Sequence, residues 1–304
     1  MSATDGAGMG AAAGAEPAYA PLCLPPRAPT RAPDFALPEG TCDCHMHIFG
    51  SRADYLLAEA RNYTPQLCTL EDYLAMMAHT GIARAVLIQP SVYGTDNRAQ
   101  LDAMARAPER FRAVVVVPPE TGEAELAALH AQGVRGIRVN ARNPGGLKLE
   151  DVPRLAARIA PFGWHIQLQT SLERLAELDD LLSAVPVPLV VDHFGLPDPR
   201  LGTSSAPFVN LLRLLESGRL WLKLSAPYRA SRIGAPFDDL LPLVEALVAT
   251  RPDRLLWASD WPHSELWDAM PDTADLVDLA GRWLPTEALR RQILAENPTR
   301  LYWA

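Results

Sequence analysis

The sequence has little lysine, no long apolar run and no cluster of basic residues. Lys148 and Lys223 are the only lysines among 304 residues, and the formal net charge is −8. This charge pattern argues against nucleic acid or an anionic membrane as a partner. No apolar run approaches the roughly 20 residues that a membrane helix needs. We therefore expect no nucleic-acid partner, no membrane partner and, by default, a cytoplasmic protein.

Cysteine is also scarce. The four cysteines are Cys23, Cys42, Cys44 and Cys68, too few and too clustered for a disulfide framework. The first 40 residues are mostly Ala, Gly and Pro, and they lack the basic and apolar regions of a signal peptide. We predict a flexible leader that continues into an extended, Pro-rich arm over residues 1–38.

From residue 41 onward, short apolar runs alternate with amphipathic stretches. Several runs ("AVLIQP", "AVVVVPP", "PLVVDHFG") are almost entirely apolar, which is typical of strands buried on both faces. The runs predict eight strands: Thr41–Phe49, Arg84–Ser91, Phe111–Pro118, Gly133–Asn140, Gly163–Thr170, Val187–Gly195, Leu220–Pro227 and Arg254–Pro262.

The stretches between these runs predict helices. The helix "LEDYLAMMAHT" has a start signal at Thr69, with Asp72 three residues later, and a stop at Gly81. No run leads into a G-x-G-x-x-G or P-loop turn, which disfavours an open nucleotide-binding sheet. Eight strands alternating with helices predict an α/β fold, a (β/α)8 TIM barrel that forms a single domain over residues 39–304.

Polar residues end the predicted strands. Active sites of such barrels lie at the carboxyl ends of the strands, and polar groups there are costly unless they serve a site. The residues concerned are His45, His47, Gln89, Ser91, Arg138, Asn140, Gln169, His193, Ser225 and Asp260. They predict one convergent site in the barrel mouth.

The first strand, "TCDCHMHIFG", carries both cysteines and histidines. Strict alternation would place Asp43, His45 and His47 on the barrel face, and Cys42 and Cys44 against the helices. A zinc site that uses both residue types would need both faces and a second ligand pair, and the sequence offers neither. We interpret the cysteines as packing residues and Asp43 as a support below the site.

Lys223 lies inside the apolar run "LWLKLSAP" and shares a strand face with Ser225. A lysine in this position is expected to need a carboxylate partner, because an unpaired charge is costly to bury. We predict a structural ion pair low in the barrel rather than a catalytic role.

The motifs "HMH", "VDHFG" and "ASDWPH" in this order resemble the amidohydrolase superfamily. With "IQPSVYGTDN", "GVRGIRVN" and "KLSAPYR", the chain from about residue 21 resembles the branch that contains 2-pyrone-4,6-dicarboxylate lactonase. The resemblance implies a hydrolase that opens the lactone ring of a carboxylated substrate in the catabolism of aromatic compounds. Its partner would be a small anionic lactone.

The resemblance also implies roles for individual residues. Asp260 would be the general base that activates water, and His45, His47 and His193 would polarise the carbonyl. The substrate-binding residues would be Arg138, Tyr63, Ser91, Arg229 and Gln169. The branch has a tyrosine at the position of Gln169 and a second arginine near Pro144, so the identity of the acid stays open.

The same residues bear on a metal. "GVRGIRVN" contains no lysine, which disfavours the carboxylated-lysine bridge of the binuclear members. The run "HIQLQT" ends on Gln169 rather than on the histidine usual in mononuclear members. We expect that no metal is required, although a single Zn²⁺ or Mn²⁺ could be held.

Three alternatives stay open from the sequence. The same branch includes a galactarolactone-type sugar-acid lactone isomerase, and the superfamily includes metal-dependent decarboxylases. The third alternative is a non-catalytic binding protein on a barrel scaffold. We expect a monomer or a small homo-oligomer, which the sequence does not distinguish.

Overall fold

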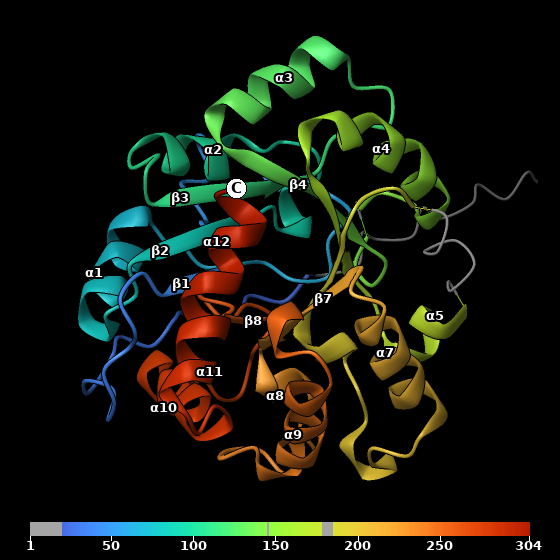
Figure 1. Ribbon diagram of the computed structural model, residues 1–304. Coiled ribbons are helices and arrows are strands. Elements are labelled where there is room, and N and C mark those ends of the chain that lie inside the picture. The colour runs from blue at the N-terminus through green and yellow to red at the C-terminus, as the bar shows by residue number, and fades with distance from the viewer. Residues whose placement is uncertain (1–19, 145, 178–184) are drawn as a thin grey trace, which may run out of the picture.

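A computed structural model describes residues 20–144, 146–177 and 185–304. Its sheet has eight strands, all parallel to their neighbours, in the sequential order β1 to β8. The strands are β1 (Cys42–Met46), β2 (Arg84–Ile88), β3 (Phe111–Val115), β4 (Val134–Asn140), β5 (His165–Gln169), β6 (Leu189–Val191), β7 (Leu220–Ser225) and β8 (Leu255–Ala258). The prediction of a (β/α)8 barrel is confirmed, and the strands are mostly shorter than the apolar runs that predicted them (Figure 1).

The sheet closes between β1 and the segment that follows β8. Asp260 N–H donates to His45 O at 3.0 Å, and His47 N–H donates to Trp261 O at 2.9 Å. These bonds hold the first and last parts of the barrel wall together, and they also bring the histidine pair beside Asp260.

Helices surround the barrel wall (Figure 1). The α-helices are α1 (Leu70–Thr80), α2 (Arg98–Ala105), α3 (Glu123–Gln132), α4 (Val152–Ile159), α5 (Leu172–Glu177), α7 (Ala206–Glu216), α8 (Pro227–Ala230), α9 (Leu241–Thr250), α10 (Thr273–Trp283), α11 (Glu287–Arg291) and α12 (Asn297–Tyr302). Helix α1 has the predicted ends, a capping box between Thr69 and Asp72 and a left-handed stop at Gly81 with φ 83°. The amphipathic stretch "SLERLAELDDLLSAV" (171–185) predicts a further helix, which is described only as α5, since 178–184 lie outside the described residues.

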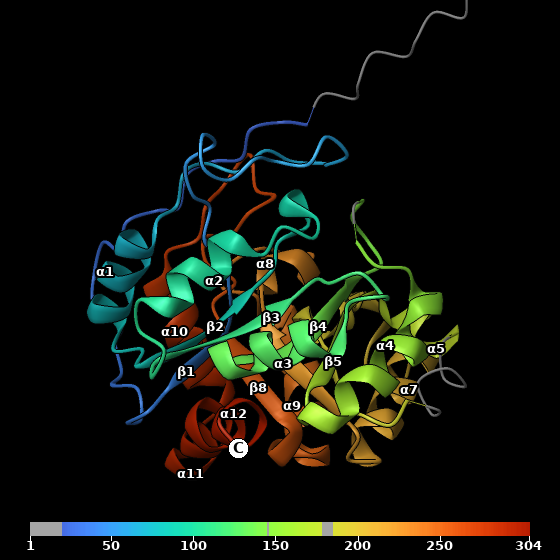
Figure 2. The same ribbon diagram turned by 90° about the horizontal axis from the view of Figure 1, so that it is seen from above.

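Helix α12 covers one end of the barrel. Tyr302 is buried with barrel residues such as Val86 and Val190, and its ring meets His165 edge-on with centroids 5.3 Å apart. Figure 2 shows α11 and α12 at this end and the arm that begins at residue 20 running past the other end. The site therefore opens at the end away from α12.

The arm before β1 is fastened to the barrel. Thr30 donates to the carboxylate of Asp272, and Arg31 forms ion pairs with Asp275 and Asp278 of α10. Cys23 N–H donates to Thr64 O at 2.8 Å. The boundary predicted at residues 38 and 39 stays a prediction, and residues 1–19 lie outside the described residues.

Strict alternation on β1 is wrong for its first half. Cys42 and Cys44 share a buried cluster with Val86 and Val190, which can meet only inside the barrel. Asp43 instead accepts a hydrogen bond from Tyr73 of α1, on the outside of the wall. The register of β1 against β2 shifts between Asp43 and Met46, and this irregularity turns His45 inward after Cys44.

None of the helices in the described part of the chain has the length and apolar character needed to cross a membrane.

Candidate active site

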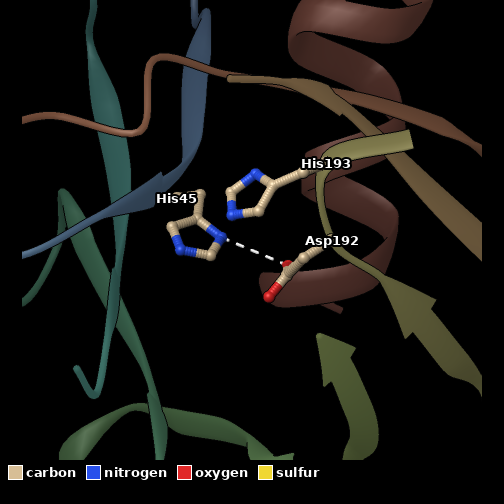
Figure 3. Close-up of side chains that lie close together, drawn as sticks. All are labelled: His45, Asp192 and His193. Carbon is tan, nitrogen blue, oxygen red and sulfur yellow. Dashed lines mark hydrogen bonds and ion pairs between the residues drawn. The ribbon is translucent and has the colours of Figure 1, made fainter. Parts of the chain in front are cut away.

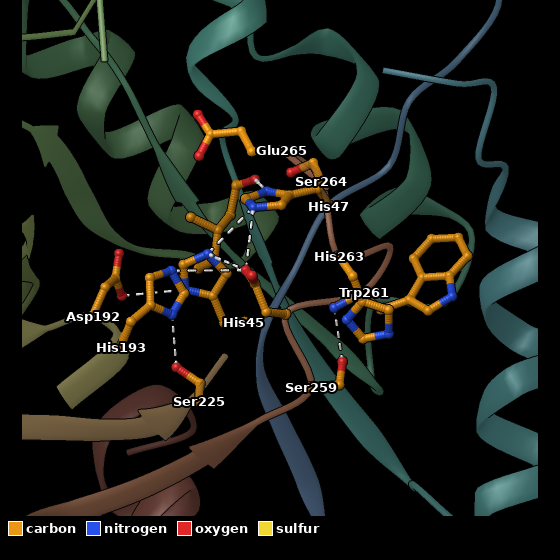
Figure 4. Close-up of polar contacts among 12 residues, drawn as sticks. His45, His47, Asp192, His193, Ser225, Ser259, Trp261, His263, Ser264 and Glu265 are labelled. Carbon is orange, nitrogen blue, oxygen red and sulfur yellow. Dashed lines mark hydrogen bonds and ion pairs between the residues drawn. The ribbon is translucent and has the colours of Figure 1, made fainter. Parts of the chain in front are cut away.

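The four residues predicted to be catalytic converge at the mouth of the barrel. Figure 4 shows the three histidines among them lying beside one another. Asp260 Oδ1 lies 3.6 Å from His45 Nε2, 3.9 Å from His47 Nε2 and 3.8 Å from His193 Nε2. All four side chains are buried. The strand ends β1, β6 and β8 thus place three imidazoles around one carboxylate oxygen.

The two oxygens of Asp260 have different surroundings. Oδ2 accepts from the Tyr228 hydroxyl at 2.7 Å and from Arg229 Nε at 3.1 Å, whereas Oδ1 faces the histidines. Burial would raise the pKa of this carboxyl, but Arg229 and the three neighbouring histidines together outweigh it and hold the pKa of Asp260 well below its usual range. Asp260 is therefore ionised at neutral pH, with Oδ2 fixed and Oδ1 directed into the site.

His47 has a defined tautomer. Its Nδ1 lies 2.6 Å from the carbonyl oxygen of Ile88, and because a carbonyl can only accept, Nδ1 carries the proton. Burial lowers the pKa of His47 to about 3, so the ring is neutral. Its Nε2 therefore presents a lone pair to the site.

His45 contacts two groups below the site, of which Figure 3 shows Asp192. Its Nδ1 lies 3.2 Å from Asp192 Oδ1 and 3.3 Å from Lys223 Nζ. Lys223 Nζ is also 3.2 Å from Asp192 Oδ1 and donates to Gln167 Oε1 at 2.7 Å, so the predicted ion pair is present, and its purely structural role stays a prediction. Burial lowers the pKa of His45 well below its usual range, which keeps this ring neutral too.

The contact between the two rings distinguishes two states of His45. His45 Nε2 lies 3.3 Å from His47 Nε2. If His45 accepts from Lys223, its Nε2–H donates to His47 and the pair is satisfied without a metal. If Nδ1–H donates to Asp192 instead, two lone pairs face each other across the site and need a cation between them.

The second state fits a divalent metal. Ligand atoms of His45, His47 and Asp260 all lie within 4.8 Å of one another. Two nitrogens about 2.0–2.1 Å from a tetrahedral ion would be about 3.3 Å apart, as these are. Within the described residues, His45, Asp192 and His193 form a second such group (Figure 3). The buried donor set could therefore hold one metal ion.

His193 completes the ring of imidazoles. Its Nδ1 lies 2.9 Å from Ser225 Oγ, at the end of β7. Burial lowers the pKa of His193 to about 4, despite the nearby carboxylate of Asp260. The His193 backbone lies in the left-handed region, with φ 52°, which bends the chain sharply after β6.

Arg138 and Gln169 lie together on neighbouring strands. Arg138 Nη2 donates to Gln169 Oε1 at 2.5 Å and Nη1 donates to Gln89 O at 2.9 Å. Nη2 is also 3.6 Å from Asp192 Oδ2. The side chain is 4% exposed, and its Nε–H has no acceptor within the described residues.

The other three predicted substrate-binding residues form a second group. Arg229 is already paired, with Asp260 on one side and with Glu265 Oε2 at 3.0 Å on the other. The buried Tyr63 hydroxyl contacts the hydroxyls of Ser264 and Ser91, and burial raises the pKa of Tyr63. Substrate binding by Arg229 and Tyr63 stays a prediction.

Asp192, Tyr228 and Glu265 were not singled out from the sequence. Asp192 carried a signal, because it is an acidic residue beside His193 in an otherwise apolar run. Burial would raise the pKa of Asp192, but Lys223, His45 and Arg138 together hold it well below the usual range. Glu265 carried no comparable signal, since it lies in an irregular segment five residues after Asp260.

Comparison with known proteins agrees with this geometry. A family model described as amidohydrolase matches residues 42–303. A 4-sulfomuconolactone hydrolase of Rhizobium radiobacter is 40% identical over 274 residues, which cover 88% of this chain and 91% of that protein.

Two further relatives extend the likeness. A 2-pyrone-4,6-dicarboxylate hydrolase of Comamonas testosteroni is 38% identical over 280 residues, covering 88% of this chain and 92% of that protein. The solved structure of an Agrobacterium tumefaciens protein superposes with a TM-score of 0.81 at 30% identity, covering 90% of this chain and 98% of the other.

Proposed function

We propose, because the chain belongs to the amidohydrolase family, that it is a hydrolase that opens a lactone ring bearing an acidic group. The observation that carries the proposal is the ionised Asp260, whose free Oδ1 is surrounded by three neutral imidazoles. The two curated relatives described above are named as hydrolases of a muconolactone and of a pyrone, which supports this reaction class.

Asp260 would act as the general base. Its Oδ1 takes a proton from water, and the hydroxide adds to the lactone carbonyl carbon. The ring C–O bond then breaks, and the ring oxygen takes the proton back from Asp260. Tyr228 and Arg229 keep the carboxylate oriented through Oδ2 during both transfers.

His193 would stabilise the oxygen on which negative charge develops, with His45 and His47 beside it. If His193 Nδ1 accepts the hydroxyl of Ser225, its Nε2–H is directed to the site. In the metal-free state, Lys223 donates to His45 Nδ1 and His45 Nε2–H donates to His47 Nε2, so these two rings hold each other in place. The His193 donor is placed before the reaction begins, which is the condition for efficient electrostatic stabilisation.

A metal is a separate question. His45, His47 and Asp260 would hold one Zn²⁺ or Mn²⁺, which when bound would supply Lewis-acid polarisation. We propose that turnover requires no metal, because the metal-free state of His45 satisfies its contacts with Lys223 and His47.

Arg138 would bind the acidic group of the substrate. Its orphan Nε–H is a buried donor that a substrate carboxylate can satisfy, and Gln169 holds the guanidinium in place. Ser91 and Tyr63 would donate neutral hydrogen bonds from the other side of the mouth. The partner would be a small anionic lactone; cytoplasmic location and oligomeric state remain predictions from the sequence.

Labelled water distinguishes hydrolysis from the alternatives. In water enriched in ¹⁸O, a hydrolase places one solvent oxygen in the product carboxylate, whereas a lactone isomerase places none. A decarboxylase would release carbon dioxide, and a binding protein would leave the lactone unchanged. Mass spectrometry of the product of a carboxylated pyrone or muconolactone therefore tests the proposal, and unlabelled product would contradict it.

A further inference from the structure

Glu265 places a carboxylate of the protein inside the site. Its Oε1 accepts from Asn143 Nδ2 at 2.6 Å and from Asn62 Nδ2 at 3.4 Å. Its Oε2 lies 3.0 Å from Arg229 Nη1 and 3.3 Å from Arg142 Nη1. The side chain is 7% exposed, so these four donors replace almost all of its water.

Glu265 occupies groups that are expected to contact the substrate, among them Arg229. Arg229 joins it to the base, since the same guanidinium contacts Asp260 and Glu265. Asn143, which donates to Glu265, also donates to Ser91 Oγ at 3.4 Å. An acid-binding position built from Arg229, Arg142 and Asn143 is therefore already filled by the protein.

The backbone holds Glu265 in this position. Its N–H donates to Cys23 Sγ at 3.3 Å, and the next residue accepts from Leu24 N–H at 2.9 Å, so the arm fastens this segment. Glu265 also has φ 61°, a left-handed conformation that a non-glycine residue keeps only when its surroundings enforce it. If a substrate carboxylate displaced Glu265, the substrate would gain these ion-pair partners, but the carboxylate of Glu265 would lose them and be left unpaired.

The positive and negative charges around the site are nearly balanced, which disfavours the binding of a dianion. The cations Arg138, Lys223 and Arg229 are matched by three anions that lie in the mouth or directly below it. These anions are Asp192, Asp260 and Glu265. Among the described charged groups of this network, Arg142 remains in excess, with a side chain that is 47% exposed.

We propose that Glu265 determines substrate charge, so that the protein acts on lactones with one acidic group rather than two. The proposal rests on the lactone hydrolysis proposed above and narrows its substrate class. Arg138 receives the single acid, and Glu265 occupies and neutralises the position that a second acid would need. A second carboxylate on the substrate would meet a fixed like charge.

The test compares two pyrones of one skeleton, 2-pyrone-6-carboxylate and 2-pyrone-4,6-dicarboxylate, by kcat/KM on the full chain. We expect the wild type to prefer the monocarboxylate by at least about tenfold. Glu265→Gln should shift this ratio toward the dicarboxylate by about tenfold, and added salt should weaken the wild-type preference. Asp268→Asn removes an exposed carboxylate of the same segment and should leave the ratio unchanged.

A wild-type preference for the dicarboxylate, or an unchanged ratio in Glu265→Gln, would overturn the proposal. Calorimetry with glutarate and monomethyl glutarate tests it without turnover and without a variant. Tighter binding of the monoester by the wild type supports the role of Glu265, and tighter binding of glutarate refutes it. If neither pyrone is hydrolysed while the monoester binds preferentially, the proposed reaction fails and the charge selection stands.

Discussion

The two sides of the barrel mouth differ in how far their polar groups are satisfied. On the side of β7 and β8, Asp260, Arg229 and Glu265 bind one another, and each has several partners. On the side of β2 to β5, buried polar atoms lack partners within the described residues: Gln89 Oε1, Arg138 Nε, Asn140 Nδ2, Asn143 Oδ1 and Thr170 Oγ1.

This difference separates two tasks. Groups that are fixed before substrate arrives need no reorganisation during the reaction, which suits the base and its supports. A buried donor or acceptor without a partner costs about 1–3 kcal/mol, which a ligand that pairs with it can recover. The β7–β8 side is therefore suited to chemistry, and the β2–β5 side to binding.

The largest effect is expected when the base is removed. Asp260→Asn keeps the shape of the side chain but cannot take a proton from water, so kcat should fall by about 10³-fold or more. Steady-state kinetics with a carboxylated lactone measures the loss, and thermal unfolding checks that the fold is kept. Asp268→Asn is the matched control. Retention of activity in Asp260→Asn would show that Asp260 is not the general base.

A smaller and selective effect is expected on the binding side. Arg138→Met removes a charged donor worth about 1.5–3 kcal/mol, so kcat/KM for a carboxylated lactone should fall roughly 10–100-fold. An uncharged lactone should be hydrolysed at the wild-type rate. An equal loss of kcat/KM for the charged and the uncharged lactone would show that Arg138 acts in the reaction itself, and the two sides of the mouth would then not differ in role.

Between pH 7 and pH 5, kcat/KM should be almost independent of pH, although a free histidine would titrate in this range. Asp260 must be ionised and has a pKa well below its usual range, while His193 must be neutral and has a pKa of about 4. As the pH falls from 7 to 5, neither group changes state, so kcat/KM should vary by less than about twofold. The decrease should begin as the pH approaches 4, and an acid limb near 6.5 would contradict the neutral histidines.

No effect is expected from chelation. If His45 donates to His47 and accepts from Lys223, prolonged dialysis against a chelator should leave kcat/KM unchanged. Elemental analysis of the dialysed protein checks that metal is absent. Activity lost on dialysis and restored by Zn²⁺ or Mn²⁺ would favour the other state of His45, in which Asp192 accepts its proton.

Much of the architecture could be predicted because its signals are local. The apolar runs predicted all eight strands, and Thr69 with Gly81 predicted both ends of α1. The four converging residues could be predicted because parallel strands bring their carboxyl ends to one side of the barrel.

The rest depends on contacts between distant segments. The irregularity after Asp43 places Cys44 and His45 both inside the barrel, which a strict period of two cannot predict. The role of Asp192 depends on Lys223, which is 31 residues away in sequence but directly beside it in the barrel. Glu265 is held by Cys23 of the arm and by Asn143, and a sequence pattern records neither contact.

Binding of substrate to the inactive protein tests the division of the mouth most directly. Calorimetric titration of a carboxylated lactone into Asp260→Asn should give a dissociation constant close to the wild-type KM, because the β2–β5 side is intact. The double variant Asp260→Asn/Arg138→Met should bind roughly 10–100-fold more weakly. Equal affinity of the two variants, or no binding to Asp260→Asn, would contradict a mouth with one side for chemistry and one for binding.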